Sequence, residues 1–89
     1  MQGYTDLFNA PARNDYSAAL RASYIWIEAF IKEHGHSPTI LEIHRGRGIT
    51  YDMARRQVIA MERRGWIAER HGLKRNIQLK GMDLQEERQ

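Results

Sequence analysis

With 89 residues and no cysteine, the chain is too short for a two-domain enzyme and contains neither disulfides nor thiolate metal ligands. It has room for one hydrophobic core built from about 60 to 70 residues. The net charge of +3 is unevenly spread, because residues 35–80 hold ten basic and four acidic residues while the two ends together hold four basic and seven acidic ones. A positive half of this kind is typical of a domain that binds a phosphate backbone.

The chain has no apolar run that approaches the roughly 18 residues of a membrane span. Its N-terminal stretch, MQGYTDLFNAPARND, is too polar and too acidic for a signal or transit peptide. We therefore expect a cytoplasmic protein without a membrane partner.

Residues 1–14 mix Gly, Pro, Asn and Asp with little periodicity, which predicts a flexible N-terminal arm. A first helix is expected from Tyr16 to Glu33, with Asn14 or Asp15 as its N-cap and Gly35 at its end. Its apolar residues recur at helical offsets and form one stripe: Leu20, Tyr24, Ile27 and Ile31.

A second, short helix is expected from Ile40 to Arg45, because Thr39 and Glu42 have the spacing of a reciprocal capping box. Gly46 and Gly48 indicate a tight turn, since glycine reaches positive φ without steric cost. A third helix should then start after the N-cap Thr50 and run to Arg64, before Gly65.

After Gly65 the pattern becomes extended. The runs WIAER and RNIQLK alternate apolar and polar residues, and HGLK between them supplies the glycine of a hairpin loop. Residues 15–80 should form the domain, and residues 81–89 a charged tail without core contacts.

The third helix should bury one face and expose the other. At about 100° per residue, Ala54, Val58 and Met61 fall on one side. Asp52, Arg56, Ile59 and Arg63 fall opposite, with Arg55 at the flank. Four residues are expected in the core or at its edge: Tyr24, Met53, Met61 and Trp66.

Three helices followed by a hairpin are the element order of a winged helix-turn-helix, an α+β fold that binds double-stranded DNA through its third helix. Arginine on such a helix can read guanine in the major groove, and basic residues of the wing can reach phosphates. The predicted DNA-binding residues are Thr50, Tyr51, Asp52, Arg55, Arg56, Ile59, Arg63, Lys74 and Arg75.

Residues 24–79 resemble the N-terminal DNA-binding domain of the LexA repressor family. The resemblance is carried by FIKEHGHSPTILEI, similar to that family's G-x-x-P-T-x-x-E-I, by ARRQVIAMERRGWI, similar to its recognition helix, and by RNIQL, similar to R-G-I-R-L. It implies base-reading positions at Thr50, Asp52, Met53, Arg55 and Arg56. The family commonly has Asn where Asp52 stands and carboxylates where Arg55 and Arg56 stand, which implies a different operator.

The resemblance ends before the self-cleaving domain of LexA, which implies no protease chemistry here and a small repressor of the phage or mobile-element type. No nucleophile with a paired base, phosphate loop or poised carboxylate pair is present, so we expect no enzyme activity and no cofactor. A metal site is not expected either, because His-x-His without a third ligand is a weak signal; the histidines are His34, His36, His44 and His71.

A second hypothesis remains open. Ile59 lies among charged residues, and Asp52 would repel phosphate, which favours a winged-helix module that binds a protein, such as a phage-encoded, anti-CRISPR-like inhibitor of a host or defence complex. Since one wing domain reads few base pairs, a homodimer on a two-fold site is also expected.

Overall fold

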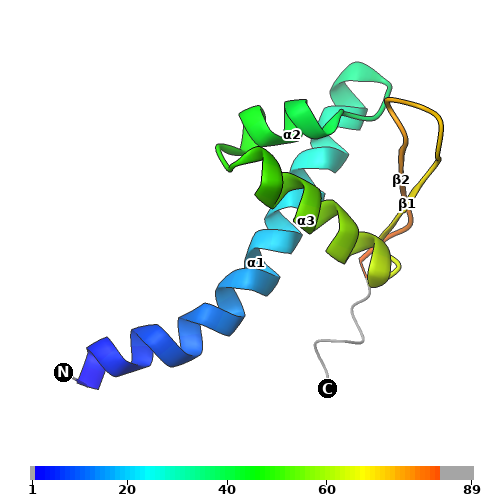
Figure 1. The fold of residues 1–89 in the computed structure, drawn as a ribbon. Coiled ribbons are helices and arrows are strands. Elements are labelled where there is room, and N and C mark those ends of the chain that lie inside the picture. Colours follow the sequence, from blue (N-terminus) through cyan, green and yellow to red (C-terminus); the bar gives the residue numbers. More distant parts are fainter. Residues whose placement is uncertain (1, 83–89) are drawn as a thin grey trace.

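The computed structural model describes the backbone of residues 2–82 and the side chains from Tyr16 to Met82. Three helices come first: α1 (Gln2–His34), α2 (Ile40–Arg47) and α3 (Tyr51–Arg63). An antiparallel hairpin follows, with β1 (Ile67–Glu69) paired to β2 (Ile77–Leu79) (Figure 1). The element order and the α+β winged helix-turn-helix fold class predicted from the sequence are confirmed.

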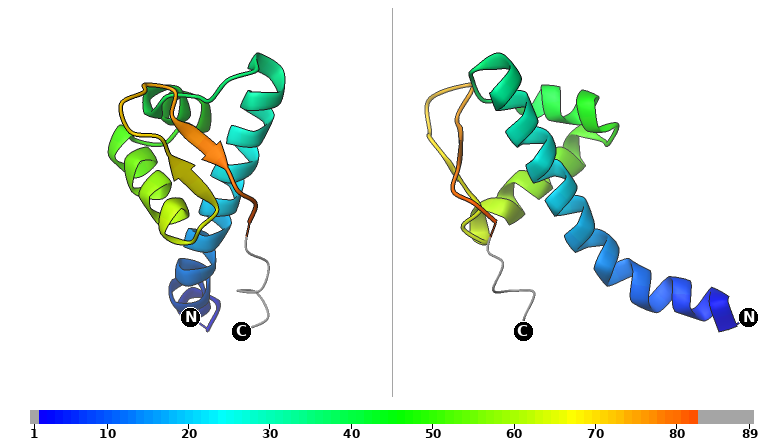
Figure 2. Two further views of the ribbon diagram at one scale, coloured as in Figure 1. Left: turned by 90° about the vertical axis from the view of Figure 1, so that its right-hand side faces the viewer. Right: turned by 180° about the vertical axis from the view of Figure 1, so that it is seen from behind.

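Helix α1 is much longer than predicted. It begins at Gln2 rather than near Tyr16, so neither Asn14 nor Asp15 marks its start. Starting a helix is costly but extending one is not, and the residues of the predicted arm can continue a helix that is already formed behind them. The first half of α1 projects away from the other elements, as both views of Figure 2 show. The flexibility of this arm stays a prediction.

The predicted caps of α2 are present. The Glu42 amide donates to the Thr39 hydroxyl over 3.1 Å, and the Thr39 amide donates to the Glu42 carboxylate over 3.0 Å. Gly48 closes α2 with a φ of 71°, which confirms its predicted role in the turn. Thr50 then caps α3 by accepting a hydrogen bond from the Met53 amide.

Gly46 has a different role from the one predicted. It lies inside α2 rather than in the turn, and a Cβ at this position would come within 2.1 Å of Cζ2 of Trp26. The absence of a side chain therefore lets the Trp26 indole of α1 rest directly on the α2 backbone.

The core lies where the three helices meet the hairpin. Its buried apolar residues are Leu20, Tyr24, Ile27, Ile43, Ala54, Val58, Met61, Trp66, Ile67 and Ile77. The predicted core positions of Tyr24, Met61 and Trp66 are confirmed, and the rings of Tyr24 and Trp66 meet edge to face at 6.1 Å. Met53 is 44% exposed, so its core assignment is wrong: it sits beside Ala54 on the first turn of α3, about 100° away from the buried seam.

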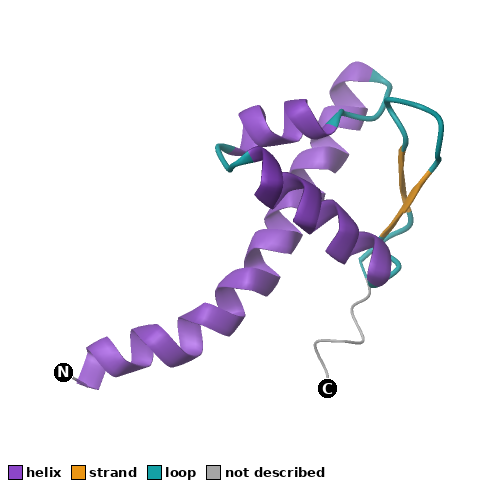
Figure 3. Ribbon diagram, viewed as in Figure 1, coloured by secondary structure: helices purple, strands orange, loops and turns teal. Residues whose placement is uncertain are grey.

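The hairpin is attached to the helices by hydrogen bonds as well as by apolar contacts. The Ile77 amide donates to the buried hydroxyl of Ser37, in the loop between α1 and α2. A further bond, from the Lys80 amide to the Trp66 carbonyl over 2.7 Å, closes the base of the hairpin itself. Figure 3 shows the short strands and the loop that joins them. Met82 packs against the core, which corrects the prediction of a tail without core contacts at that residue; residues 83–89 lie outside the described part of the chain.

Candidate nucleic-acid interface

Helix α3 exposes a basic face. Arg55, Arg56 and Arg63 are all exposed, and the opposite side of the helix is buried through Ala54, Val58 and Met61. This orientation is the one that the apolar periodicity predicted. Helix α3 crosses in front of α1 in Figure 1, so its outer side points away from the helix on which it packs.

The N-terminal end of α3 carries further polar groups. Thr50 is exposed, and its hydroxyl oxygen accepts the capping hydrogen bond from the Met53 amide. The hydroxyl hydrogen can still be donated to another acceptor. Tyr51 is 46% exposed and stands edge to face with the ring of His44 at 6.2 Å. The predicted site residues from Thr50 to Arg63 are thus all exposed, on α3 or at its N-cap.

Asp52 and Arg56 are brought together on this surface. Arg56 Nε lies 3.0 Å from Asp52 Oδ2, and both side chains are at least 70% exposed. An exposed i,i+4 ion pair contributes little to stability, so Arg56 can leave Asp52 for a stronger anion at small cost. Asp52 therefore offsets part of the charge of this face without blocking it.

Ile59 lies at the edge of a small hollow. It is 36% exposed, and together with Ile40, Arg55, Val58 and Glu69 it lines a cavity of about 150 Å³ between α3, the start of α2 and β1. The hollow gives Ile59 an apolar neighbour in Ile40, which partly accounts for an isoleucine among charged residues.

The structure separates the two predicted wing residues, Lys74 and Arg75. Lys74 is exposed in the hairpin loop. Arg75 instead forms two hydrogen bonds with the Glu42 carboxylate, over 2.7 and 3.0 Å, and a third with the Ser37 carbonyl over 2.9 Å. A guanidinium held in this way fastens the wing to the start of α2.

This pairing changes the acidity of Glu42. The hydrogen bond from Arg75, followed by that from the Thr39 amide, lowers the pKa of the Glu42 carboxyl from 4.5 to about 2. The hydrogen bond with Glu42 in turn raises the pKa of Arg75. Glu42 thus serves both the helix cap and the attachment of the wing, which the sequence alone did not indicate.

Residues 17–81 match the sequence pattern of the LexA DNA-binding domain. The chain belongs to the LexA DNA-binding domain family. Two LexA repressors from Thermotoga neapolitana are each 34% identical to it over 65 residues, which is 73% of this chain and 33% and 31% of theirs. The chain therefore spans about a third of the length of these LexA relatives, and the match confirms the resemblance read from the sequence.

One polar cluster in this LexA-type domain was missed by the sequence analysis. The buried Ser23 hydroxyl of α1 donates to Oε1 of Gln57 in α3 and accepts from Nε of Arg47 over 3.0 Å. These three residues join α1, the end of α2 and α3. A glutamine three residues after Ala54, on the apolar seam, is the signal that could have found it.

The histidines of the LexA-type domain do not gather into a metal site. His34 and His36 stack at 5.9 Å, whereas His44 Nδ1 contacts the Ile49 carbonyl. Within residues 16–82, no three His, Asp or Glu side chains are grouped so that they could hold an ion. Nor does any helix among the described residues combine the length and the apolar character of a membrane span.

Proposed function

We propose that this LexA-type domain is a sequence-specific regulator of transcription that binds double-stranded DNA, with α3 in the major groove and the hairpin wing beside it. The observation that carries the proposal is the exposed basic face of α3, with Arg55, Arg56 and Arg63 directed away from the core. An α-helix fits the major groove, and arginine pairs with the O6 and N7 of guanine there.

Thr50 and the basic residues of the interface have different roles in this proposal. Arg55 and Arg56 contact bases or nearby phosphates, and Arg63, about two helical turns further along, contacts the DNA backbone with Thr50. Lys74 approaches the flanking phosphates from the wing loop. Arg75, which is already bound to Glu42, holds the wing in position rather than contacting DNA.

The operator differs from that of typical family members. Arg55 and Arg56 replace the carboxylates common at these positions, and a guanidinium recognises guanine where a carboxylate accepts from the amino group of cytosine. A homodimer on a two-fold site would supply the additional base pairs that one domain does not read. The origin in a phage or mobile element, the cytoplasmic location and the lack of enzyme activity stay predictions.

A random-site selection against duplex DNA, followed by gel shifts over a salt series, tests this function. We expect one enriched motif and an affinity that falls steeply with salt, because each neutralised phosphate releases counterions. Absent binding, or binding that salt does not weaken, would contradict the proposal.

The second candidate function is a protein-binding module. It is favoured by the hollow beside Ile59 and by the negative charge of Asp52 in the middle of the basic face. A pull-down from host lysate, with and without nuclease, separates the two candidates. A partner that is retained after nuclease treatment and lost in Ile59→Asp favours the protein module, whereas loss with nuclease favours DNA.

A further inference from the structure

Four neighbouring rings form a row along the C-terminal half of α1 and the loop that follows it. Ring centroids lie 5.4 Å apart for Trp26 and Phe30, 4.2 Å for Phe30 and His34, and 5.9 Å for His34 and His36. The Trp26 indole is held on one side by α2, because it rests on the α2 backbone at Gly46. Trp26 also packs against the edge of the core, and the row as a whole forms one continuous aromatic surface.

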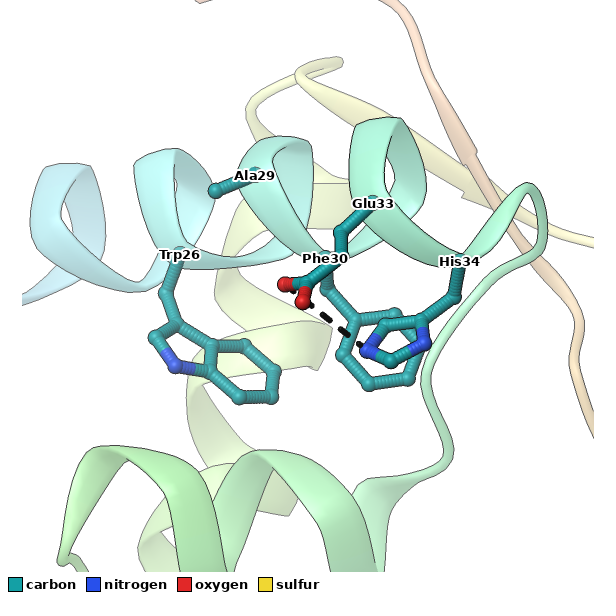
Figure 4. Close-up of a pocket in the computed structure, with 5 residues that line it drawn as sticks. All are labelled: Trp26, Ala29, Phe30, Glu33 and His34. Carbon is teal, nitrogen blue, oxygen red and sulfur yellow. Dashed lines mark ion pairs between the residues drawn. The ribbon is translucent and has the colours of Figure 1, made fainter.

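A pocket opens between these rings. Its walls are Trp26, Ala29, Phe30, Glu33 and His34, and its volume is about 230 Å³. Figure 4 shows the Glu33 carboxylate reaching over the space between the Trp26 and Phe30 rings. Since one water takes up about 30 Å³ of liquid volume, the pocket can hold the four heavy atoms of a guanidinium with room to spare.

The chemistry of the walls selects a cation. Aromatic faces carry the negative side of the ring quadrupole and attract cations, and the Glu33 carboxylate adds a full negative charge at the mouth. Glu33 is 78% exposed and its contact with His34 is long, at 3.9 Å between Oε1 and Nε2, so the carboxylate is available to a ligand. The same charge repels a phosphate backbone.

We propose that this pocket binds an arginine side chain presented by a protein partner. A planar guanidinium can stack on an indole or phenyl face while its N–H groups pair with a carboxylate, a geometry that the compact ammonium of lysine does not offer. The pocket is lined by residues of α1 and by none of α3, and Figure 4 shows it on the side of α1 that faces α2. It is independent of the proposed DNA binding and can be occupied while DNA is bound.

Titration of the full chain with Nα-acetyl-arginine methylamide, followed by amide and indole NMR shifts, tests the proposal. Citrulline in the same derivative is the neutral probe of equal shape. We expect saturable shifts at the Trp26 indole and the Gly46 amide, no shift at the buried Trp66 indole, and binding in the millimolar range. The citrulline probe should bind at least about threefold more weakly.

Two variants test whether the Glu33 carboxylate supplies the negative charge that binds arginine. Glu33→Gln should weaken arginine binding about threefold or more, whereas Glu28→Gln, an exposed carboxylate of the same helix outside the pocket, should not. Equal affinities for both probes, equal effects of both variants, or no saturable shift at Trp26 would overturn the proposal. Trp26 shifts that follow the protein concentration without any probe would assign the pocket to a second copy of this chain instead.

Discussion

Arg75 and Glu42 hold the wing against the start of α2 through a two-pronged ion pair, with Nη1 2.7 Å from Oε1 and Nη2 3.0 Å from Oε2. The neighbouring residue, Lys74, is exposed in the hairpin loop. Two adjacent basic residues of one loop therefore have different tasks, and their variants should behave differently on DNA.

Lys74→Ala should weaken binding evenly across DNA sequences and reduce the salt slope by about one, because one phosphate contact is lost. Arg75→Ala should also weaken binding, through a displaced wing, but should leave the salt slope near that of the unchanged protein. Fluorescence anisotropy over a salt series measures both slopes. A slope that falls equally in the two variants would place Arg75 on a phosphate.

The wing attachment should also respond to acid. The folded protein lowers the pKa of Glu42 from 4.5 to about 2, so this carboxylate stabilises the folded state fully above its ordinary pKa. Its contribution is lost as the pH falls from about 4.5 towards about 2. Thermal unfolding followed by circular dichroism should show a smaller acid-induced loss for Glu42→Gln than for the unchanged protein; equal losses would mean that the pair has no such role.

The parts of the fold that could be predicted from the sequence are those set by neighbouring residues. Thr39 and Glu42 are three residues apart, as are Thr50 and the amide that it caps, so short spacings were enough to place both helix starts. The buried seam of α3 likewise follows from periodicity alone.

The missed features join residues that are distant in the sequence. Arg75 and Glu42 are 33 residues apart, and Ser23 and Gln57 are 34 apart, so no local spacing could reveal either contact. Gly46 was predicted to be a turn residue, whereas the structure requires glycine there because the Trp26 indole of another helix packs against it. The length of α1 was missed because helix extension depends on the ordered helix that follows.

Gly46→Ala should destabilise the domain by about 1 to 3 kcal/mol, since its Cβ would overlap the Trp26 indole and force α1 and α2 apart. The sign of the change in unfolding free energy is informative, because Gly→Ala in an unhindered helix stabilises the helix by up to about 1 kcal/mol. Urea unfolding measures the difference. A more stable Gly46→Ala variant would show that Trp26 does not rest on α2.

Ser23→Ala should cost about 1 to 3 kcal/mol of unfolding free energy, because it leaves Gln57 Oε1 and Arg47 Nε without their shared partner. Ser17→Ala, on the same helix but outside this cluster, is the matched control and should change little. If the two variants have the same stability, then the buried hydrogen bonds do not fix α3 against α1.

The basic face of α3 is proposed to read DNA. The most direct test of this role compares the affinities of the Arg55→Ala and Lys32→Ala variants for the selected operator. Both variants lose one exposed positive charge, but Lys32 belongs to α1 and not to α3. We expect Arg55→Ala to bind roughly 5- to 150-fold more weakly and with blurred sequence preference, and Lys32→Ala to bind almost normally. Equal, small losses in both variants would contradict the assignment of α3 to the major groove.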